Sequence, residues 1–372
     1  MVLGPRSAYA ALLGLAALDA AGYSIIAPVV PAIADETGAG PTVVGALVTM
    51  FAVGQLAGYP LAGRGIQWRH ASLVLAAALA CMVVGDLGFV LGDSLAIYFP
   101  SRLLQGIGAG GLWIGITFAV LERFPGEEYR RLTGILAAYS VGSILGPSLG
   151  AIGGIRGPFL LHLGLVLAGA AAVAALGAPR TPARFGSDRT ALRAPGFWLA
   201  SAGIGLVAVG LGSLEGPLPL HFSSELSQAG IAALYVAGAV VAGAAATLAG
   251  RAAPRPALVV GGVAVLGGVA LAGAVANVPL WVVAVALTGV GVGAGEAGAL
   301  GILLETIGPA RIVTAMVVWS QLWAVGYLAA PVAAGGVAET LGFGAVGLVP
   351  LAGAVLVAVA LARSTRPADE AA

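Results

Sequence analysis

The sequence predicts an all-α polytopic membrane protein with twelve transmembrane helices in two pseudo-symmetric six-helix bundles. Three observations support this prediction: the composition, the placement of the arginines, and an internal repeat. Hydrophobic residues make up 59% of the 372 residues and charged residues only 9%, and the mean hydropathy is +1.02. Soluble domains carry about 25% charged residues. The chain is therefore expected to lie in a lipid bilayer.

The apolar runs predict the positions of the spans, because a helix needs roughly 20 apolar residues to cross a bilayer. Twelve such runs occur between turn-forming or charged residues, and Gly63-Arg64, for example, is expected to end the second. The expected spans are residues 8–33, 42–62, 72–92, 95–119, 132–154, 158–178, 196–216, 228–249, 256–276, 279–303, 312–336 and 341–362.

Arginine placement predicts the topology, since basic residues in short loops favour the cytoplasmic side. Fifteen arginines fall on one side of the membrane, Arg156 falls on the other, and Arg102 lies inside a span. A multi-pass protein of a bacterial inner membrane with both termini in the cytoplasm is expected. The fifteen are Arg6, Arg64, Arg69, Arg123, Arg130, Arg131, Arg180, Arg184, Arg189, Arg193, Arg251, Arg255, Arg311, Arg363 and Arg366.

The halves of the chain repeat each other. Residues 106–122 (GIGAGGLWIGITFAVLE) align without gaps with residues 289–305 (GVGVGAGEAGALGILLE), offset by 183. A parallel repeat of six helices follows, because six is an even number of crossings. We expect an N-terminal bundle at 1–178, a polar cytoplasmic linker at 179–195, a C-terminal bundle at 196–363 and a disordered tail at 364–372.

Three motifs carry a family resemblance. Leu18-Asp19 is followed by Pro28-Val29-Val30-Pro31 in span one, Arg102-Leu103-Leu104-Gln105-Gly106 lies in span four, and residues 142–150 of span five read G-x-x-x-G-P-x-x-G. Together they resemble the motifs of twelve-helix drug:proton antiporters of the major facilitator superfamily, such as tetracycline exporters and vesicular monoamine carriers. The resemblance implies the major facilitator fold, a substrate site between the halves near the midplane, and proton transfer at the span-four motif.

The span-five motif also has a physical meaning. Glycines four residues apart allow close helix approach in lipid, and a proline bends the helix. We expect this face to approach a helix of the other half and to move during transport; a Gly-rich structural helix is the alternative. The residues assigned to conformational change are Pro28, Pro31, Gly142, Gly146, Pro147 and Gly150.

The loop between spans two and three departs from the family pattern G-x-L-a-D-R-x-G-R-R. Gly63 stands in place of the acid, which in the family helps to latch the two halves together on the cytoplasmic face. A weaker or differently built latch is expected. The residues assigned to this cytoplasmic loop motif are Gly58, Arg64 and Arg69.

Charged and polar side chains inside spans are rare and are functional candidates. Asp19, Arg102, Gln105 and Glu296 are assigned to proton coupling. A carboxylate at Asp19 can bind either a proton or a cation, which is the simplest chemistry for exchange. Arg102 needs a partner, and we expect Asp19 in preference to several carbonyl groups. A purely structural role remains the alternative for each residue.

Four other polar residues in or near the spans are weaker candidates for a functional role. Glu215 is expected near the outer end of span seven, as a gate residue or a solvated helix end, and Asp86 is expected to be structural. His162 and His221 are expected near the outer face. Neither has a second ligand at metal spacing, so no metal site is expected.

Aromatic side chains deep in the spans are expected to line a substrate cavity. Three of them recur every four residues along span eleven and share one helix face; a packing or lipid-facing stripe is the alternative. Such a cavity with one or two acids favours lipophilic or cationic compounds. The residues assigned to substrate binding are Tyr23, Trp113, Tyr139, Trp319, Gln321, Trp323 and Tyr327.

The sequence therefore predicts a secondary active transporter that exports small amphipathic or drug-like compounds in exchange for protons. A proton-coupled or facilitated carrier of a metabolite or sugar is the alternative. A membrane-embedded enzyme is remote, because one Cys and three scattered His offer no nucleophile–base pair, and there is no Walker-type ATP motif. We expect a monomer without cofactor or metal that does not bind nucleic acid.

Overall fold

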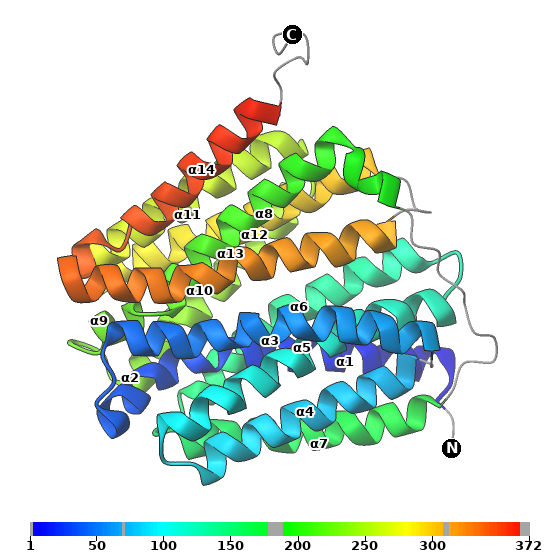
Figure 1. The fold of residues 1–372 in the computed structure, drawn as a ribbon, viewed down its shortest axis with the longest axis horizontal. Helices are drawn as coiled ribbons and strands as arrows, with labels where there is room; N and C mark the ends of the chain where they lie inside the picture. Colours follow the sequence, from blue (N-terminus) through cyan, green and yellow to red (C-terminus); the bar gives the residue numbers. More distant parts are fainter. Residues whose placement is uncertain (1–2, 69–70, 178–188, 308–311, 365–372) are drawn as a thin grey trace.

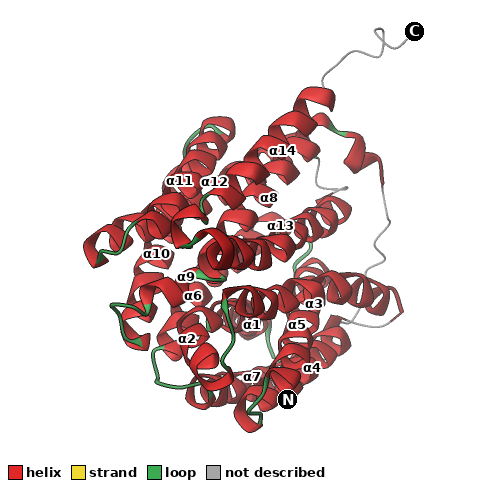
Figure 2. Cartoon of the chain, turned by 60° about the vertical axis from the view of Figure 1, so that its left-hand side comes forward, coloured by secondary structure: helices red, strands yellow, loops and turns green. Residues whose placement is uncertain are grey.

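The computed structural model describes residues 3–68, 71–177, 189–307 and 312–364, and these residues are organised in α-helices and short 3-10 helices (Figures 1 and 2). The elements are α1 Pro5–Ser24, α2 Ile26–Thr37, α3 Pro41–Trp68, α4 Ala71–Leu91, α5 Leu95–Arg123, α6 Glu128–Gly150, α7 Arg156–Leu176, η1 Arg189–Arg193, α8 Pro195–Glu215, α9 Leu218–Phe222, α10 Gln228–Ala249, α11 Pro254–Ala274, α12 Val278–Thr306, α13 Ile312–Leu341, η3 Phe343–Ala345 and α14 Leu348–Ser364.

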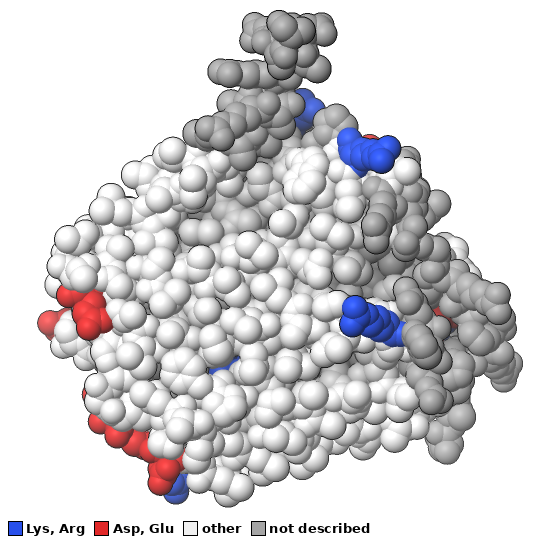
Figure 3. All heavy atoms as spheres, viewed as in Figure 1, with Lys and Arg blue, Asp and Glu red and all other residues white. Residues whose placement is uncertain are grey.

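The helices have the length and polarity of membrane spans. Within the described residues, eleven helical segments are long and apolar enough to cross a bilayer, and a shorter apolar segment, Phe343–Ala358, lies where the twelfth span is predicted. Charged side chains gather at the two ends of the molecule, and the face seen in Figure 3 is nearly uncharged between them. Acids occupy the end where α2 and α9 lie, which we call the acidic end; we call the opposite end the arginine-rich end.

The first span is divided into α1 and α2 at Ile25. The cause is local. Pro28 and Pro31 have no backbone N–H, so the carbonyl groups four residues earlier lose their helical donors. The Ser24 hydroxyl donates to the Ala20 carbonyl oxygen at 2.8 Å, just before the break. The span is therefore interrupted at Ile25, six residues after Asp19.

The second span is longer than predicted. The expectation that Gly63-Arg64 ends it is wrong, because α3 continues to Trp68. A glycine inside a helix costs only about 1 kcal/mol relative to alanine, which a long apolar helix tolerates. Gly58 lies inside α3 and not in a loop, and a Cβ there would stand 2.5 Å from the Ile107 carbonyl oxygen. Arg64 is exposed, and Arg69 lies outside the described residues.

The predicted repeat is expressed in the fold. Helices α5 and α12 each have 29 residues, and their bounds, 95 to 123 and 278 to 306, differ by 183 at both ends. Glycines on α5 pack against α3, and the equivalent glycines on α12 pack against α10. A Cβ at Gly110 would lie 2.9 Å from the Gln55 carbonyl oxygen, so only glycine allows this separation of backbones.

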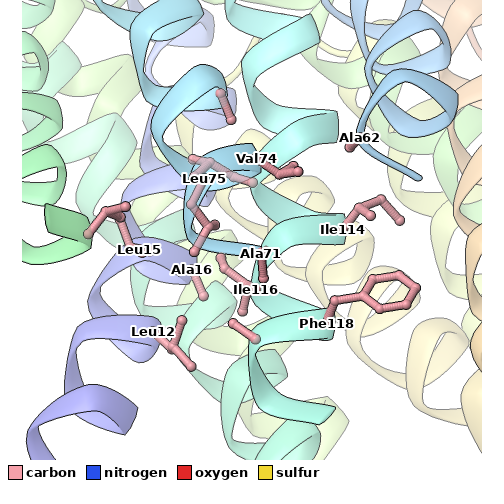
Figure 4. Packing of buried hydrophobic residues seen from close by; sticks show 14 of the residues in the cluster. Leu12, Leu15, Ala16, Ala62, Ala71, Val74, Leu75, Ile114, Ile116 and Phe118 are labelled. Atoms are coloured by element: carbon pink, nitrogen blue, oxygen red, sulfur yellow. The ribbon is translucent and has the colours of Figure 1, made fainter. Parts of the chain in front are cut away.

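Helices α1–α7 and α8–α14 pack mainly among themselves, and they meet along α3 with α13 and α6 with α10 (Figure 1). The core of the first group is aliphatic, with Leu12 and Leu15 of α1 near Leu75 of α4 and Ile114 and Ile116 of α5 (Figure 4). The division into bundles at 179–195 stays a prediction, because residues 178–188 lie outside the described part of the chain. The tail beyond Ser364 lies outside it as well.

Candidate functional site

A cavity of about 750 Å³ lies between the two groups of helices. Its wall comes from α1, α3, α5 and α6 on one side and α8, α10, α12 and α13 on the other. Three carboxylates reach it, from Asp19, Glu215 and Glu296, and the described lining residues include no Arg, Lys or His. The cavity is thus acidic and otherwise largely apolar.

The cavity is closed toward the acidic end by contacts between the two groups of helices. The Thr49 hydroxyl donates to the Leu328 carbonyl oxygen at 2.9 Å, and the Gln228 side chain donates to the Gly150 carbonyl oxygen at 2.7 Å. At the tip, the Thr42 hydroxyl of α3 donates to the carboxylate of Glu339 on α13. In the other direction the lining extends to Gly250 and Leu304, near the arginine-rich end.

Asp19 lies near the end of α1, with 3% of its surface exposed. Its Oδ2 accepts a hydrogen bond from the Tyr139 hydroxyl of α6, and its Oδ1 has no partner among the described residues. The Tyr139 ring packs edge-on against Trp113, with centroids 5.3 Å apart. The predicted acid therefore stands in an aromatic part of the wall with one oxygen available.

Arg102 does not pair with Asp19, so the expected partner is wrong. Its Nη1 donates to the Gly22 carbonyl oxygen and to Gln105 Oε1, both at 3.0 Å, and its Nη2 donates to the Tyr23 carbonyl oxygen at 2.9 Å. The guanidinium lies 4.3 Å from the centroid of the Phe51 ring. Two carbonyl groups just before the α1–α2 break, together with Gln105, therefore hold this charge.

We expect the effects of Arg102→Ala and Asp19→Asn on stability to be additive, because the two side chains share no partner. The measurement is thermal unfolding of the wild type, both single variants and the double variant in detergent. A coupling energy within about 0.5 kcal/mol is expected for independent sites. A double variant clearly more stable than Arg102→Ala alone would instead indicate that the two charges interact.

Five of the seven residues that the sequence assigns to substrate binding line the cavity, and their role in binding stays a prediction. Tyr23, Trp113, Tyr139, Trp319 and Trp323 line the cavity. Trp323 also stacks on Tyr327 with centroids 5.2 Å apart, and Tyr23 packs against both rings. Gln321 and Tyr327 are not among the described lining residues. Tyr327 is fully buried behind the wall.

The sequence predicts that Glu215 lies near the outer end of span seven, as a gate residue or a solvated helix end. In the structure it is 3% exposed and lines the cavity, and it accepts a hydrogen bond of 2.6 Å from the Tyr327 hydroxyl. Asp19–Tyr139 joins spans one and five, and Glu215–Tyr327 joins spans seven and eleven. Each half therefore contains a carboxylate–tyrosine pair between corresponding spans, although the residues of the two pairs do not align at the offset of the repeat. Glu296 lines the cavity from α12 without a hydrogen-bond partner among the described residues.

Comparison with known families identifies the architecture. Residues 12–272 match the model of the Major Facilitator Superfamily. The chain belongs to the major facilitator superfamily. The membrane-spanning helices and the cavity between two helix groups agree with this family.

Two solved structures have the same fold as this member of the major facilitator superfamily. An inward-facing, unoccupied bacterial homologue of the human lysosomal transporter Spinster superposes with a TM-score of 0.74 at 15% identity, covering 96% of this chain and 95% of the other. The human organic anion transporter MFSD10 (TETRAN) superposes with a TM-score of 0.65 at 16% identity, covering 95% of this chain and 100% of the other.

Sequence relatives include drug-resistance transporters. "Multidrug resistance protein 1" of Bacillus subtilis is 31% identical over 130 residues, which are 35% of this chain and 33% of the relative. "Quinolone resistance protein NorA" of Staphylococcus aureus is 26% identical over 130 residues, 35% of this chain and 34% of the relative. The matches thus span about a third of the length of these curated relatives.

The glycine motif of span five has a different neighbour from the one expected. Gly142, Gly146 and Gly150 face α1 and α2 of the same half and not the other half. A Cβ at Gly146 would stand 2.5 Å from the Ala21 carbonyl oxygen, and one at Gly150 would stand 2.9 Å from the Ile25 carbonyl oxygen. The sequence shows that a small-residue face exists, but it carries no information on which helix covers that face.

Proposed function

We propose that this transporter exports small amphipathic cations in exchange for protons, by alternating access. The cavity carries the proposal: three carboxylates and five predicted aromatic residues line it, and the described lining contains no basic side chain. Aromatic faces and carboxylates attract a cation with an apolar body. The names of the drug-resistance relatives agree with such a substrate.

Asp19 is the proposed coupling group. A carboxylate in these apolar surroundings carries either a proton or a cation, since a bare charge is costly there. Proton binding and substrate binding at Asp19 then exclude each other, which is the requirement for exchange. Glu215 and Glu296 would hold the positive charge on the other wall, while Arg102 and Gln105 would position α1 through its carbonyl groups.

The orientation completes the proposal. The arginine-rich end would face the cytoplasm and the acidic end the outside of a bacterial inner membrane, following the positive-inside tendency. The structure would then represent an inward-facing state of a monomer with two bundles joined by a cytoplasmic linker. Reporter fusions at Ser187 and at the C-terminus should both read cytoplasmic, and an external signal from Ser187 would contradict this orientation.

The test uses proteoliposomes and ethidium, a planar aromatic cation. With the purified protein reconstituted, an imposed pH gradient should move ethidium toward the side of higher proton concentration, and ethidium addition should move protons the opposite way. Liposomes without protein and vesicles treated with a protonophore are the controls. Ethidium transport that ignores the pH gradient would contradict proton coupling, and no ethidium transport would contradict the proposed substrate class.

A further inference from the structure

A chain of four buried polar side chains lies in the first helix group, away from the cavity wall. Arg102 Nη1 donates to Gln105 Oε1 at 3.0 Å, and Gln105 Nε2 donates to Asp86 Oδ1 at 2.7 Å. Asp86 Oδ2 lies 2.8 Å from His162 Nδ1. All four side chains are at most 1% exposed, and none of them is among the described lining residues. Burying these groups is costly unless their hydrogen bonds and charges are satisfied together.

The number of hydrogen bonds that His162 can make depends on how many protons the Asp86–His162 pair holds. Its Nε2 lies 3.3 Å from the Leu18 carbonyl oxygen, which can only accept, so this contact is a hydrogen bond only when Nε2 carries a hydrogen. A second hydrogen must then lie between Nδ1 and the Asp86 carboxylate. It belongs either to an imidazolium or to a protonated carboxyl group. In both cases the pair carries one proton more than a neutral imidazole beside a carboxylate.

Loss of that proton changes the contact with α1. The ring would then carry one hydrogen but face two acceptors, Asp86 Oδ2 and the Leu18 carbonyl oxygen. One of its nitrogens, Nδ1 or Nε2, would therefore present a lone pair to an acceptor. The contact to Leu18 is the longer of the two and is the one we expect to break. The ring also packs on the α1 backbone at Gly22, where a Cβ would lie 2.7 Å from His162 Cε1. Leu18 and Gly22 flank Asp19 on the same helix.

The charged groups around the pair are few. From α5, Arg102 is linked to Asp86 through Gln105, and from α1, Asp19 follows the residue whose carbonyl oxygen contacts the ring. Helices α4 and α7 contribute Asp86 and His162 themselves. A proton leaving the pair would leave one net negative charge, which the nearby guanidinium of Arg102 offsets.

We propose that Asp86 and His162 form a second proton-carrying site of the transporter, separate from the substrate cavity, whose charge state is transmitted to α1 beside Asp19. The pair binds one proton from water and releases it to water, and the substrate never touches it. This inference rests on the proposed proton coupling, and it adds a site that neither the motifs nor the cavity contains.

The first test measures the proton directly. Solid-state NMR of ¹⁵N-histidine-labelled protein in lipid, with His162 assigned by elimination through His70→Gln and His221→Gln, reports the ring nitrogens. Infrared spectroscopy reports a protonated carboxyl group that disappears in Asp86→Asn. We expect a doubly protonated ring or a protonated Asp86 near neutral pH, and no change in the exposed control Asp93→Asn. A neutral ring together with an ionised Asp86 would overturn the proposal.

The second test counts protons during transport. His162→Gln keeps a hydrogen-bonding side chain but cannot titrate in this range. In proteoliposomes with ethidium, we expect it to move about one proton fewer per cation than the wild type, with a flatter pH profile. If the wild type is proton-coupled and His162→Gln moves the same number of protons per cation with the same pH profile, the second site is overturned and the proposed function stands. A wild type that moves no protons would instead contradict the proposed function. If His162→Gln does not fold, the spectroscopic test on the wild type still decides.

Discussion

Asp19→Asn is expected to abolish pH-driven transport of ethidium while leaving folded protein in the membrane. Asparagine keeps the shape of the side chain and can still accept a hydrogen bond from Tyr139, but it cannot exchange a proton for a cation. We expect a loss on the order of a hundredfold or more in the initial rate, typical of removing an essential proton-transfer group. The measurement is ethidium flux in proteoliposomes under an imposed pH gradient.

Asp93→Asn is the matched control, because Asp93 is an exposed acid beyond the end of α4 and the substitution is chemically identical. It should transport at the wild-type rate. Size-exclusion chromatography of both variants separates lost function from lost folding. Normal pH-driven flux in Asp19→Asn would remove this carboxylate from the coupling mechanism.

Gly146→Leu is expected to damage the packing of the first helix group, because α6 and α1 leave no room for a side chain at this position. A side chain there meets backbone atoms of α1, with the Ala21 carbonyl oxygen at 2.5 Å and the Ile25 nitrogen at 3.0 Å from the Cβ position. Backbone atoms of a packed helix cannot move aside as a flexible side chain can. Overpacking of this kind costs about 1–3 kcal/mol, and the full leucine side chain adds to that cost.

The measurement is the yield of monodisperse protein and its thermal unfolding in detergent. Gly164→Leu is the control, because Gly164 lies in the middle of α7 and a Cβ there would meet nothing within 4 Å. We expect Gly164→Leu to resemble the wild type and Gly146→Leu to unfold at a clearly lower temperature. Equal stability of the two variants would show that α6 and α1 do not approach as closely as the structure describes.

The fold was largely predictable, because its signal is local. The span at 228–249 was predicted with the bounds that α10 has, and the others differ mainly at their ends. Some predicted boundaries were wrong. At Gly63-Arg64, a glycine and a charged residue were expected to end the helix, but α3 continues to Trp68 because a helix can carry both residues where it extends beyond the apolar layer. The repeat was visible as well, since close helix packing in lipid requires glycine at fixed positions.

The residues that line the cavity were largely predictable from the sequence, but the contacts among the buried polar side chains were not. Asp19, Glu296 and five aromatic residues were selected because charge and aromatic rings are unusual inside spans, and they line the cavity. The partner of Arg102, the burial of Glu215 and the Asp86–His162 contact were not selected correctly. Each depends on which direction a side chain takes around its helix and on which helix stands there.

The sequence by itself determined the membrane class, the positions of the spans, the duplication and the residue types that the interior would contain. Only the tertiary structure decided which residues meet: the glycines of α6 with α1, Arg102 with the carbonyl oxygens of Gly22 and Tyr23, and His162 with Asp86. The physical reason is the solvent. In lipid the outer and inner faces of a helix are both apolar, so hydropathy reveals where a helix crosses but not which face it turns toward its neighbours.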